Sequence, residues 1–196
     1  MKRAIESLKN LVVNPDIFHV ENTDDFDIGR TEFRLLIPDI NKNIKVIRKV
    51  TEVLNIVMAK RIENKIVTDY YIEGYDRVRK IKNSDSVKYY DIKGHTVFKT
   101  IREIEKDEFK ELIKKSHTTV IKHIAAYKKI AEDFEVCFEY IIHGNRLHFS
   151  VELEVNDIHD GLSWLESFVD LLNLKSGDYH ISSEPLIDLL YDINKK

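Results

Sequence analysis

The sequence predicts an α+β protein in which an antiparallel β-sheet is closed into a tunnel-like barrel with flanking helices. Residues 67 to 155 form short runs rich in β-branched and aromatic residues, separated by turn signals such as Gly94-His95 and Gly144-Asn145. Amphipathic helical patterns precede and follow these runs. Several runs carry charges at every second position, which gives one apolar and one charged face and favours a barrel with a charged interior.

The composition is that of one globular domain, which we expect to span residues 1 to 196. With 43% hydrophobic and 33% charged residues, the chain can bury one sizeable core, and six glycines and three prolines leave little material for linkers. The net charge of −3 excludes a general positive field, so a polyanion would need a local basic cluster. A single cysteine, Cys137, and the lack of a signal peptide or a long apolar run predict a cytoplasmic protein without membrane association.

Helical periodicity indicates five helices. A short amphipathic helix is expected over residues 1 to 11, and the longest internal helix over 41 to 60. The runs "DEFKELIKKS" (107–116), "DGLSWLESFVDLLN" (160–173) and "EPLIDLLYDIN" (184–194) predict three more. Trp164 is expected to anchor its helix in the core.

The clearest strand pattern is "RLHFSVELEV", residues 146 to 155. Its period of two places Leu153 and Val155 among the apolar residues of one face, and Glu152 and Glu154 on the other. An earlier run, "RTEFRLLI", likewise separates Phe33 from Glu32 and Arg34. Such carboxylates either form a solvated surface or line a charged interior where they hold a divalent cation.

Basic residues follow the same period in other predicted strands. Arg77 and Arg79 share a face with no carboxylate between them, so they repel each other unless an anion lies nearby. Lys93 ends the next strand. In "VFKTIREIE" Lys99 shares a face with Glu103 and Glu105, whereas Arg102 lies on the other. Either glutamate could orient a water molecule or simply face solvent before the next helix.

In their order, these features resemble the triphosphate tunnel metalloenzymes, which include CYTH-domain phosphatases and cyclases and the metal-dependent RNA triphosphatases of fungi and large DNA viruses. The matching segments are "RTEFRLLI", the helix over 41 to 60, "YDRVRK", "KYYDIKG", "FKTIREIE", the basic hairpin from residue 120 and "VELEV". The resemblance covers about residues 28 to 190, and its weight lies in the order of the set.

The resemblance implies a set of site residues. The metal, Mg²⁺ or Mn²⁺, would be bound by Glu32, Glu152 and Glu154, because hard cations prefer oxygen ligands. Catalytic cations would be Arg77, Arg79, Lys93 and Arg102. Phosphate-binding cations would be Arg34, Arg77, Arg79, Lys93, Lys99, Lys122 and Lys128, of which Lys122 and Lys128 match the basic hairpin only loosely.

One position departs from the family pattern. The family's first strand carries two glutamates, but this sequence has Arg30 before Glu32. The strand register is then shifted, or the metal site has three carboxylates, or the protein binds triphosphates without hydrolysing them. The same cations can neutralise a triphosphate in each case.

The function that the resemblance implies is metal-dependent removal of the γ-phosphate from RNA 5′-triphosphate ends, the first step of mRNA capping, or from nucleoside triphosphates. The organisation is closest to the viral and fungal RNA triphosphatases, which implies a guanylyltransferase partner and a cytoplasmic, viral setting. A non-catalytic tunnel that binds triphosphate, polyphosphate or nucleotide, and a structural interaction domain, are the alternatives. Nothing in the sequence indicates an oligomeric state.

Overall fold

The structure, a computed structural model, describes residues 31–42, 44–57, 65–94, 99–131 and 134–194. The helix expected over residues 1 to 11, and Arg30, lie outside these ranges. The structure confirms the expected fold class. It combines one antiparallel sheet with helices on both sides of it.

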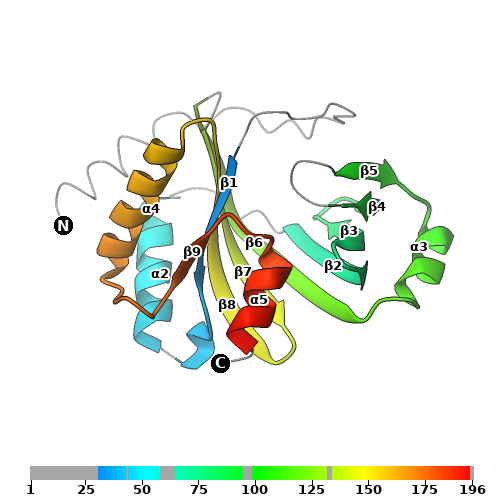
Figure 1. Ribbon diagram of the computed structural model, residues 1–196, viewed down its shortest axis with the longest axis horizontal. Helices are drawn as coiled ribbons and strands as arrows, with labels where there is room; N and C mark the ends of the chain where they lie inside the picture. The colour runs from blue at the N-terminus through cyan, green and yellow to red at the C-terminus, as the bar shows by residue number, and fades with distance from the viewer. Residues whose placement is uncertain (1–30, 43, 58–64, 95–98, 132–133, 195–196) are drawn as a thin grey trace.

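The sheet of the described residues has nine strands in the order β5-β4-β3-β2-β6-β7-β8-β1-β9. Its edge strands are not hydrogen-bonded to each other. Instead the sheet is strongly curled, so that β1 and β3 to β5 lie on opposite sides of its concave face (Figure 1). The strands are β1 (Thr31–Ile37), β2 (Lys65–Glu73), β3 (Asp76–Lys82), β4 (Val87–Lys93), β5 (Thr100–Glu103), β6 (Thr118–Ala131), β7 (Phe134–His143), β8 (Arg146–Val155) and β9 (His180–Ser182).

The predicted strands appear close to their expected positions, with one addition. Strand β6 is 14 residues long and pairs with both β2 and β7, and two register shifts interrupt its pairing with β7. Such irregularities bend a strand and increase its twist. The short strand β9 pairs with β1 and had no alternating pattern of its own, because three residues are too few to show one.

Two helices cover the convex face of β1, β7 and β8. They are α2 (Ile44–Val57) and α4 (Ile158–Leu172), and a 3₁₀ turn, η1 (Ile40–Lys42), precedes α2. The aromatic side chains of Phe138, Phe149 and Phe168 are fully buried between these helices and the sheet. Trp164 stacks on Phe168 with ring centroids 5.6 Å apart, which confirms that it anchors α4 in the core.

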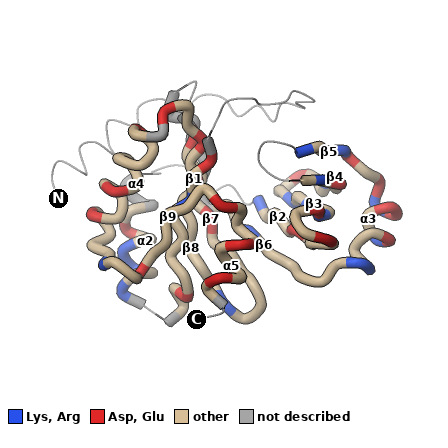
Figure 2. The backbone as a smooth tube through the Cα atoms, viewed as in Figure 1, with Lys and Arg blue, Asp and Glu red and all other residues tan. Residues whose placement is uncertain are grey.

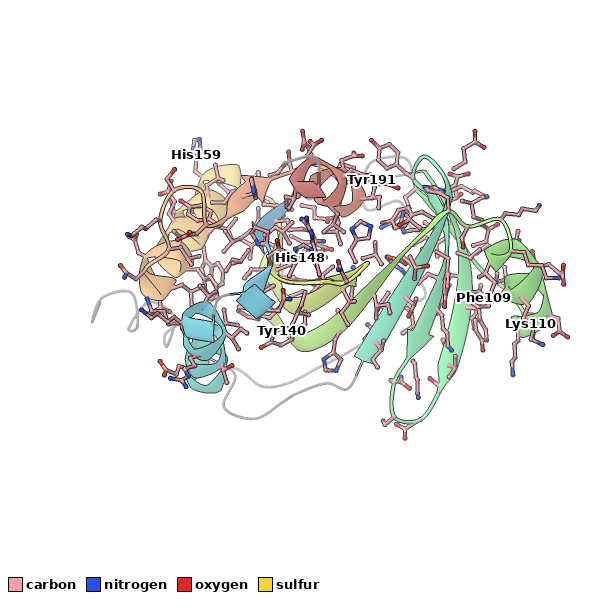
Figure 3. All side chains as sticks on the ribbon, turned by 90° about the horizontal axis from the view of Figure 1, so that it is seen from below. Phe109, Lys110, Tyr140, His148, His159 and Tyr191 are labelled. Carbon is pink, nitrogen blue, oxygen red and sulfur yellow. The ribbon has the colours of Figure 1, made fainter. Side chains whose placement is uncertain are left out.

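Helix α3 (Lys106–Ile113) packs on the convex face of β3 and β4 through a separate apolar cluster. Phe109 is 5% exposed and its ring lies 4.6 Å from that of Tyr89. Figure 3 shows Phe109 pointing to the strands while the next residue, Lys110, points away. None of the described helices is both long and apolar enough to span a bilayer.

Helix α5 (Leu186–Asn194) lies on the concave side instead. Its buried Leu186 and Leu190 pack with Leu36, Val120 and Ile141, which lie towards one end of β1, β6 and β7. This end of the concave face is therefore apolar and covered by a helix (Figure 1). The charged side chains occupy the remainder of the same face.

Close packing of α4 on the sheet leads to a stability prediction. A Cβ added to Gly161 would lie 2.9 Å from Cγ2 of Val155, which is buried and stiff at χ1. Alanine gains about 1 kcal/mol of helix propensity over glycine, whereas overpacking a core costs about 1–3 kcal/mol. We expect Gly161→Ala to lower the free energy of unfolding by about 1 kcal/mol in urea titrations, by the same two terms.

Val155→Ala provides the matched background. There the alanine at position 161 has space, so the same Gly161→Ala change should be neutral or stabilising. An equal loss in both backgrounds would contradict the proposed contact.

Candidate functional site

The concave face carries the charged alternation that the sequence predicts. In the pairing of β1 with β8, Glu32 lies opposite Glu154, and Arg34 lies opposite Glu152. Their neighbours Phe33 and Leu153 point to the convex core. The carboxylates of the "VELEV" strand thus line the inside of the curved sheet, and with Glu32 and Arg34 of β1 they form what we call the acidic wall. Figure 2 shows how acidic and basic residues are distributed along the strands.

Arg34 lies at the centre of the acidic wall. It is 3% exposed, and its Nη1 donates to Glu139 Oε2 at 2.6 Å and to Ser150 Oγ at 2.8 Å. Its Nη2 is 3.3 Å from Glu32 Oε1 and also forms an ion pair with Glu152. Burial by itself would lower the pKa of Arg34, but the charges of Glu139 and Glu32 raise it above its ordinary value.

Glu139 on β7 was missed as a site residue from the sequence. It is 1% exposed and also forms an ion pair with Lys122 of β6, with 3.1 Å between Oε1 and Nζ. Burial would raise the pKa of Glu139, yet Lys122 and Arg34 lower it overall. Glu139 alternates with the buried Phe138 and shares its face of the strand with Cys137, and this period of two was the signal that could have identified it.

The arginines predicted to need an anion have one in the protein. Asp69 of β2 accepts from Arg79 Nε at 2.6 Å and from Arg79 Nη2 at 2.9 Å, and lies 3.8 Å from Arg77 Nε. Asp69 is buried, which would raise its pKa, but Arg79 above all lowers the pKa to about 2. No pattern in the sequence indicated that this carboxylate, on a neighbouring strand, would join the pair.

Arg77 and Arg79 form what we call the basic wall, together with Lys99, which precedes β5. Nε of Arg77 is buried and makes no hydrogen bond within the described part of the chain, while its guanidinium lies 5.7 Å from the ring centre of Tyr71. One aspartate therefore faces two arginines, and a buried donor remains unsatisfied. This wall has capacity for a further anion.

Lys99 links the two walls electrostatically. Its pKa is lowered first by desolvation and then by the positive charges of Arg79 and Arg77, and is raised by Glu32 and Glu154. Arg77 and Arg79 come from β3, whereas Glu32 and Glu154 come from β1 and β8, at the other side of the curved sheet. Lys99 therefore lies within electrostatic reach of both walls.

Two of the predicted catalytic cations lie on the other face of the sheet. Arg102 binds Glu108 of α3 at 2.5 Å and Asp91 at 3.4 Å. Lys93 lies 3.4 Å from Asp76 and 3.5 Å from Asp91. Because side chains alternate along a strand, these positions on β4 and β5 point away from the concave face that Tyr90 and Glu103 share.

The remaining predicted residues have varied positions. Lys122 points into the concave face, as its pairing with Glu139 requires. Lys128 lies on β6 opposite Val136, but its side chain is outside the described part of the chain. Glu103 lies beside Lys88 at 3.5 Å, and Glu105 is the exposed N-cap residue of α3.

The predicted metal ligands Glu32, Glu152 and Glu154 share one face of two neighbouring strands. Glu135 of β7 lies opposite Glu154 on the other side and extends the row. Within the described ranges no three acidic, histidine or cysteine side chains are close enough together to hold a metal ion, because Glu32 and Glu152 turn to Arg34. The donor set is nevertheless made entirely of oxygen and fits a hard divalent cation.

The ion pairs of Asp69 with Arg77 and Arg79 should make the stability of the fold depend on pH. A folded-state pKa of about 2 against an ordinary 3.8 stabilises the fold above pH 3.8, and this contribution of about 2 kcal/mol is lost as the pH falls towards 2. Asp69→Asn should lower the free energy of unfolding at pH 7 by about 3 kcal/mol, since it leaves buried arginine charge without a counterion.

Urea titrations at several pH values measure this effect. The deficit of Asp69→Asn should shrink by about 2 kcal/mol between pH 5 and pH 2. The exposed Asp170→Asn on α4 is the control and should behave as wild type at each pH. A deficit that does not change with pH would contradict the role given to Asp69.

The fold is found in proteins of known structure, although no family model and no curated protein matches the sequence. A protein of Pyrococcus horikoshii superimposes with a TM-score of 0.54 at 17% identity, over 82% of this chain and 98% of that one. A candidate adenylate cyclase of Bacillus halodurans gives 0.50 at 11% identity, over 81% and 95%.

A third solved structure is a candidate adenylyl cyclase of Hippeastrum described as having a dominant triphosphatase activity. It superimposes with a TM-score of 0.50 at 10% identity, over 83% of this chain and 95% of that one. At these identities the likeness concerns the fold. The curled antiparallel sheet and these superpositions show that the chain shares its fold with the three solved structures, and this fold agrees with the one expected from the resemblance seen in the sequence.

Proposed function

We propose that this protein binds a triphosphate on its concave face and hydrolyses the γ-phosphate with the help of a divalent cation. The observation that carries the proposal is the make-up of the concave face, where Arg77 and Arg79 of β3 share the single carboxylate of Asp69 and the carboxylates of Glu32 and Glu154 lie side by side on β1 and β8. A triphosphate between the walls would meet cations on one side and metal-binding oxygens on the other.

The basic wall performs the binding. Asp69 occupies the edge of Arg79 formed by Nε and Nη2, which fixes the guanidinium in place before any ligand arrives. The unsatisfied Nε of Arg77 gains an acceptor when a phosphate oxygen approaches. Lys99 adds a further positive charge. The two arginines are thus preorganised on a rigid strand, which lowers the cost of ordering them around the substrate.

Glu32, Glu152 and Glu154 would hold the cation, and Glu135 could complete the row. When bound, Mg²⁺ or Mn²⁺ neutralises phosphate oxygens and polarises the phosphoryl group. Arg34 is already paired with Glu32 and Glu152, so it holds these carboxylates in place and disperses their mutual repulsion. It acts here as a positioning residue.

Hydrolysis then requires no side-chain nucleophile. The oxygen of a water molecule bonds to the γ-phosphorus while the bond from that phosphorus to the bridging oxygen breaks, which gives inorganic phosphate, the diphosphate and one proton released to solvent. Negative charge grows on the bridging oxygen and on the γ-phosphoryl oxygens. Arg77, Arg79 and Lys99 stabilise this charge, and the fixed positions of the two arginines make their electrostatic stabilisation effective.

The finer form of the proposal takes RNA 5′-triphosphate ends as the substrate, with free nucleoside triphosphates as the second substrate class. The edge strands β5 and β9 of the described sheet are not hydrogen-bonded to each other, and we propose that a polymer attached to the triphosphate passes between them. The Hippeastrum neighbour, described as a cyclase with triphosphatase activity, supports triphosphate chemistry in general. A guanylyltransferase partner and a viral, cytoplasmic setting belong to this RNA form of the proposal.

A second candidate is a tunnel that binds triphosphates without hydrolysing them. It is favoured by one observation, the ion pairs that Glu32 and Glu152 make with Arg34. If these pairs persist in the presence of Mg²⁺, too few carboxylate oxygens remain for a cation, and binding by the basic wall takes place alone.

The decisive test is phosphate release from ATP and from 5′-triphosphate RNA with Mg²⁺ or Mn²⁺. We expect the wild type to release phosphate, and the Glu152→Gln, Glu154→Gln variant to lose roughly 100-fold or more of this activity, because it lacks the metal ligands but keeps the shape of the wall. The exposed Glu166→Gln on α4 is the matched control and should keep full activity.

The outcomes separate the two candidates. No release by the wild type, with tripolyphosphate still raising its melting temperature, would establish the binding module. If the wild type neither releases phosphate nor is protected by tripolyphosphate, both candidates are contradicted, and the interaction domain is the remaining alternative. Equal loss in Glu166→Gln would indicate damage unrelated to the wall.

A further inference from the structure

The part of the concave face next to the basic wall has a different chemistry. In the pairing of β3 with β4, Tyr90 lies directly opposite Arg79, and in the pairing of β4 with β5 it lies opposite Glu103. Ile101 is also on β5, two residues before Glu103, and therefore lies on the same face of the sheet. An aromatic ring and an aliphatic side chain thus border the arginines.

The direction of Tyr90 follows from that of its neighbour. Tyr89 belongs to the convex cluster of α3, where it contacts Phe109. Successive side chains of a strand point to opposite faces, so Tyr90 points to the concave side. Its proximity to Arg79 agrees with this. Burial raises the pKa of the Tyr90 hydroxyl overall, and the positive charge of Arg79 acts to lower it.

Neither side chain is used by the core. Tyr90 is half-exposed and does not belong to any of the three apolar clusters formed by the described residues. Ile101 is 44% exposed, which is unusual for a large aliphatic residue on the inner face of a sheet. The ion pair between Lys88 and Glu103 borders Tyr90 and neutralises the nearest charges. Tyr90 and Ile101 therefore present accessible apolar surface, and two of the charges at its border, Lys88 and Glu103, are paired with each other.

We propose that Tyr90, supported by Ile101, is the surface on which the nucleobase of the substrate stacks. The inference rests on the proposed function, because it assumes a triphosphate held by Arg77 and Arg79. Adjacent strands lie about 4.8 Å apart, so a phosphate chain over β2 and β3 directs the nucleoside to β4 and β5. There an aromatic ring meets the flat face of a base, and the apolar side chain of Ile101 covers its edge.

The consequence is a substrate preference. A triphosphate that carries a base, as a free nucleotide or as the first nucleotide of an RNA, gains stacking energy that inorganic tripolyphosphate cannot gain. Every base has a π-face, so the preference is for nucleotides over tripolyphosphate and extends to all four bases. Tyr90 thereby determines specificity without acting on the reacting phosphorus.

The test compares two ligands on the full chain. Dissociation constants are measured by calorimetry with Mg²⁺ for the β,γ-imido analogue of ATP and for tripolyphosphate, using wild type, Tyr90→Leu and Tyr90→Phe. Tyr90→Leu should weaken nucleotide binding about 5- to 30-fold, as expected for the loss of one stacked ring, and change tripolyphosphate binding less than about twofold. Tyr90→Phe keeps the ring and should bind both ligands as wild type does.

A second variant protects the test from a folding artefact. Ile101→Ser alters an exposed position, and it should weaken the nucleotide about two- to fivefold while leaving tripolyphosphate unchanged. Equal losses for both ligands in Tyr90→Leu, or no loss for either, would overturn the role of Tyr90 and leave the proposed function standing. Failure of the wild type to bind either ligand would overturn both.

Discussion

The rest of the site depends on the buried ion pair between Arg34 and Glu139. A curled sheet with a charged inner face must keep ionised groups away from bulk water, and burying an unpaired charge is costly. Arg34 forms ion pairs with carboxylates from β1, β7 and β8, so its buried charge is neutralised. Glu139 forms a second ion pair, with Lys122 from β6. These contacts join four strands from within, on the part of the concave face that lies outside the apolar cluster of α5.

Such a network is a weak source of net stability, because the desolvation of its members offsets most of the attraction. The fold is instead stabilised by the apolar core on the convex side, around Phe138 and Trp164, and by the cluster that α5 forms at one end of the concave side. Retaining so many charges inside the sheet is therefore better explained by what they bind. Their arrangement in two walls of opposite character suits a ligand that carries both phosphate groups and a cation.

The two walls also divide the work within the proposed site. The positive charge of the basic wall is only partly neutralised, because the single carboxylate of Asp69 faces two arginines. The wall therefore favours an additional anion. The acidic wall is balanced by Arg34, and a cation would have to compete with that guanidinium for Glu32 and Glu152. In the proposed function, binding and hydrolysis thus depend on different charge balances, so the second can be lost while the first is retained. Next to the walls, Tyr90 and Ile101 supply the apolar surface that the phosphates do not need but a base does.

By itself the sequence determined the fold class, most strand positions and the facing of individual side chains, because the period of two in "RLHFSVELEV" and "RTEFRLLI" fixes which residues share a face. It also indicated that Arg77 and Arg79 require an anion. Which residue supplies it, Asp69, is decided by the neighbouring strand, and strand order is a tertiary property. The same holds for Glu139, which becomes a site residue only because β7 lies between β6 and β8. For Arg102 and Lys93 the sequence was less informative. Alternation placed Arg102 correctly on the other face from Lys99. Only the packing of α3 and the position of Asp91 decided that this other face is the convex one.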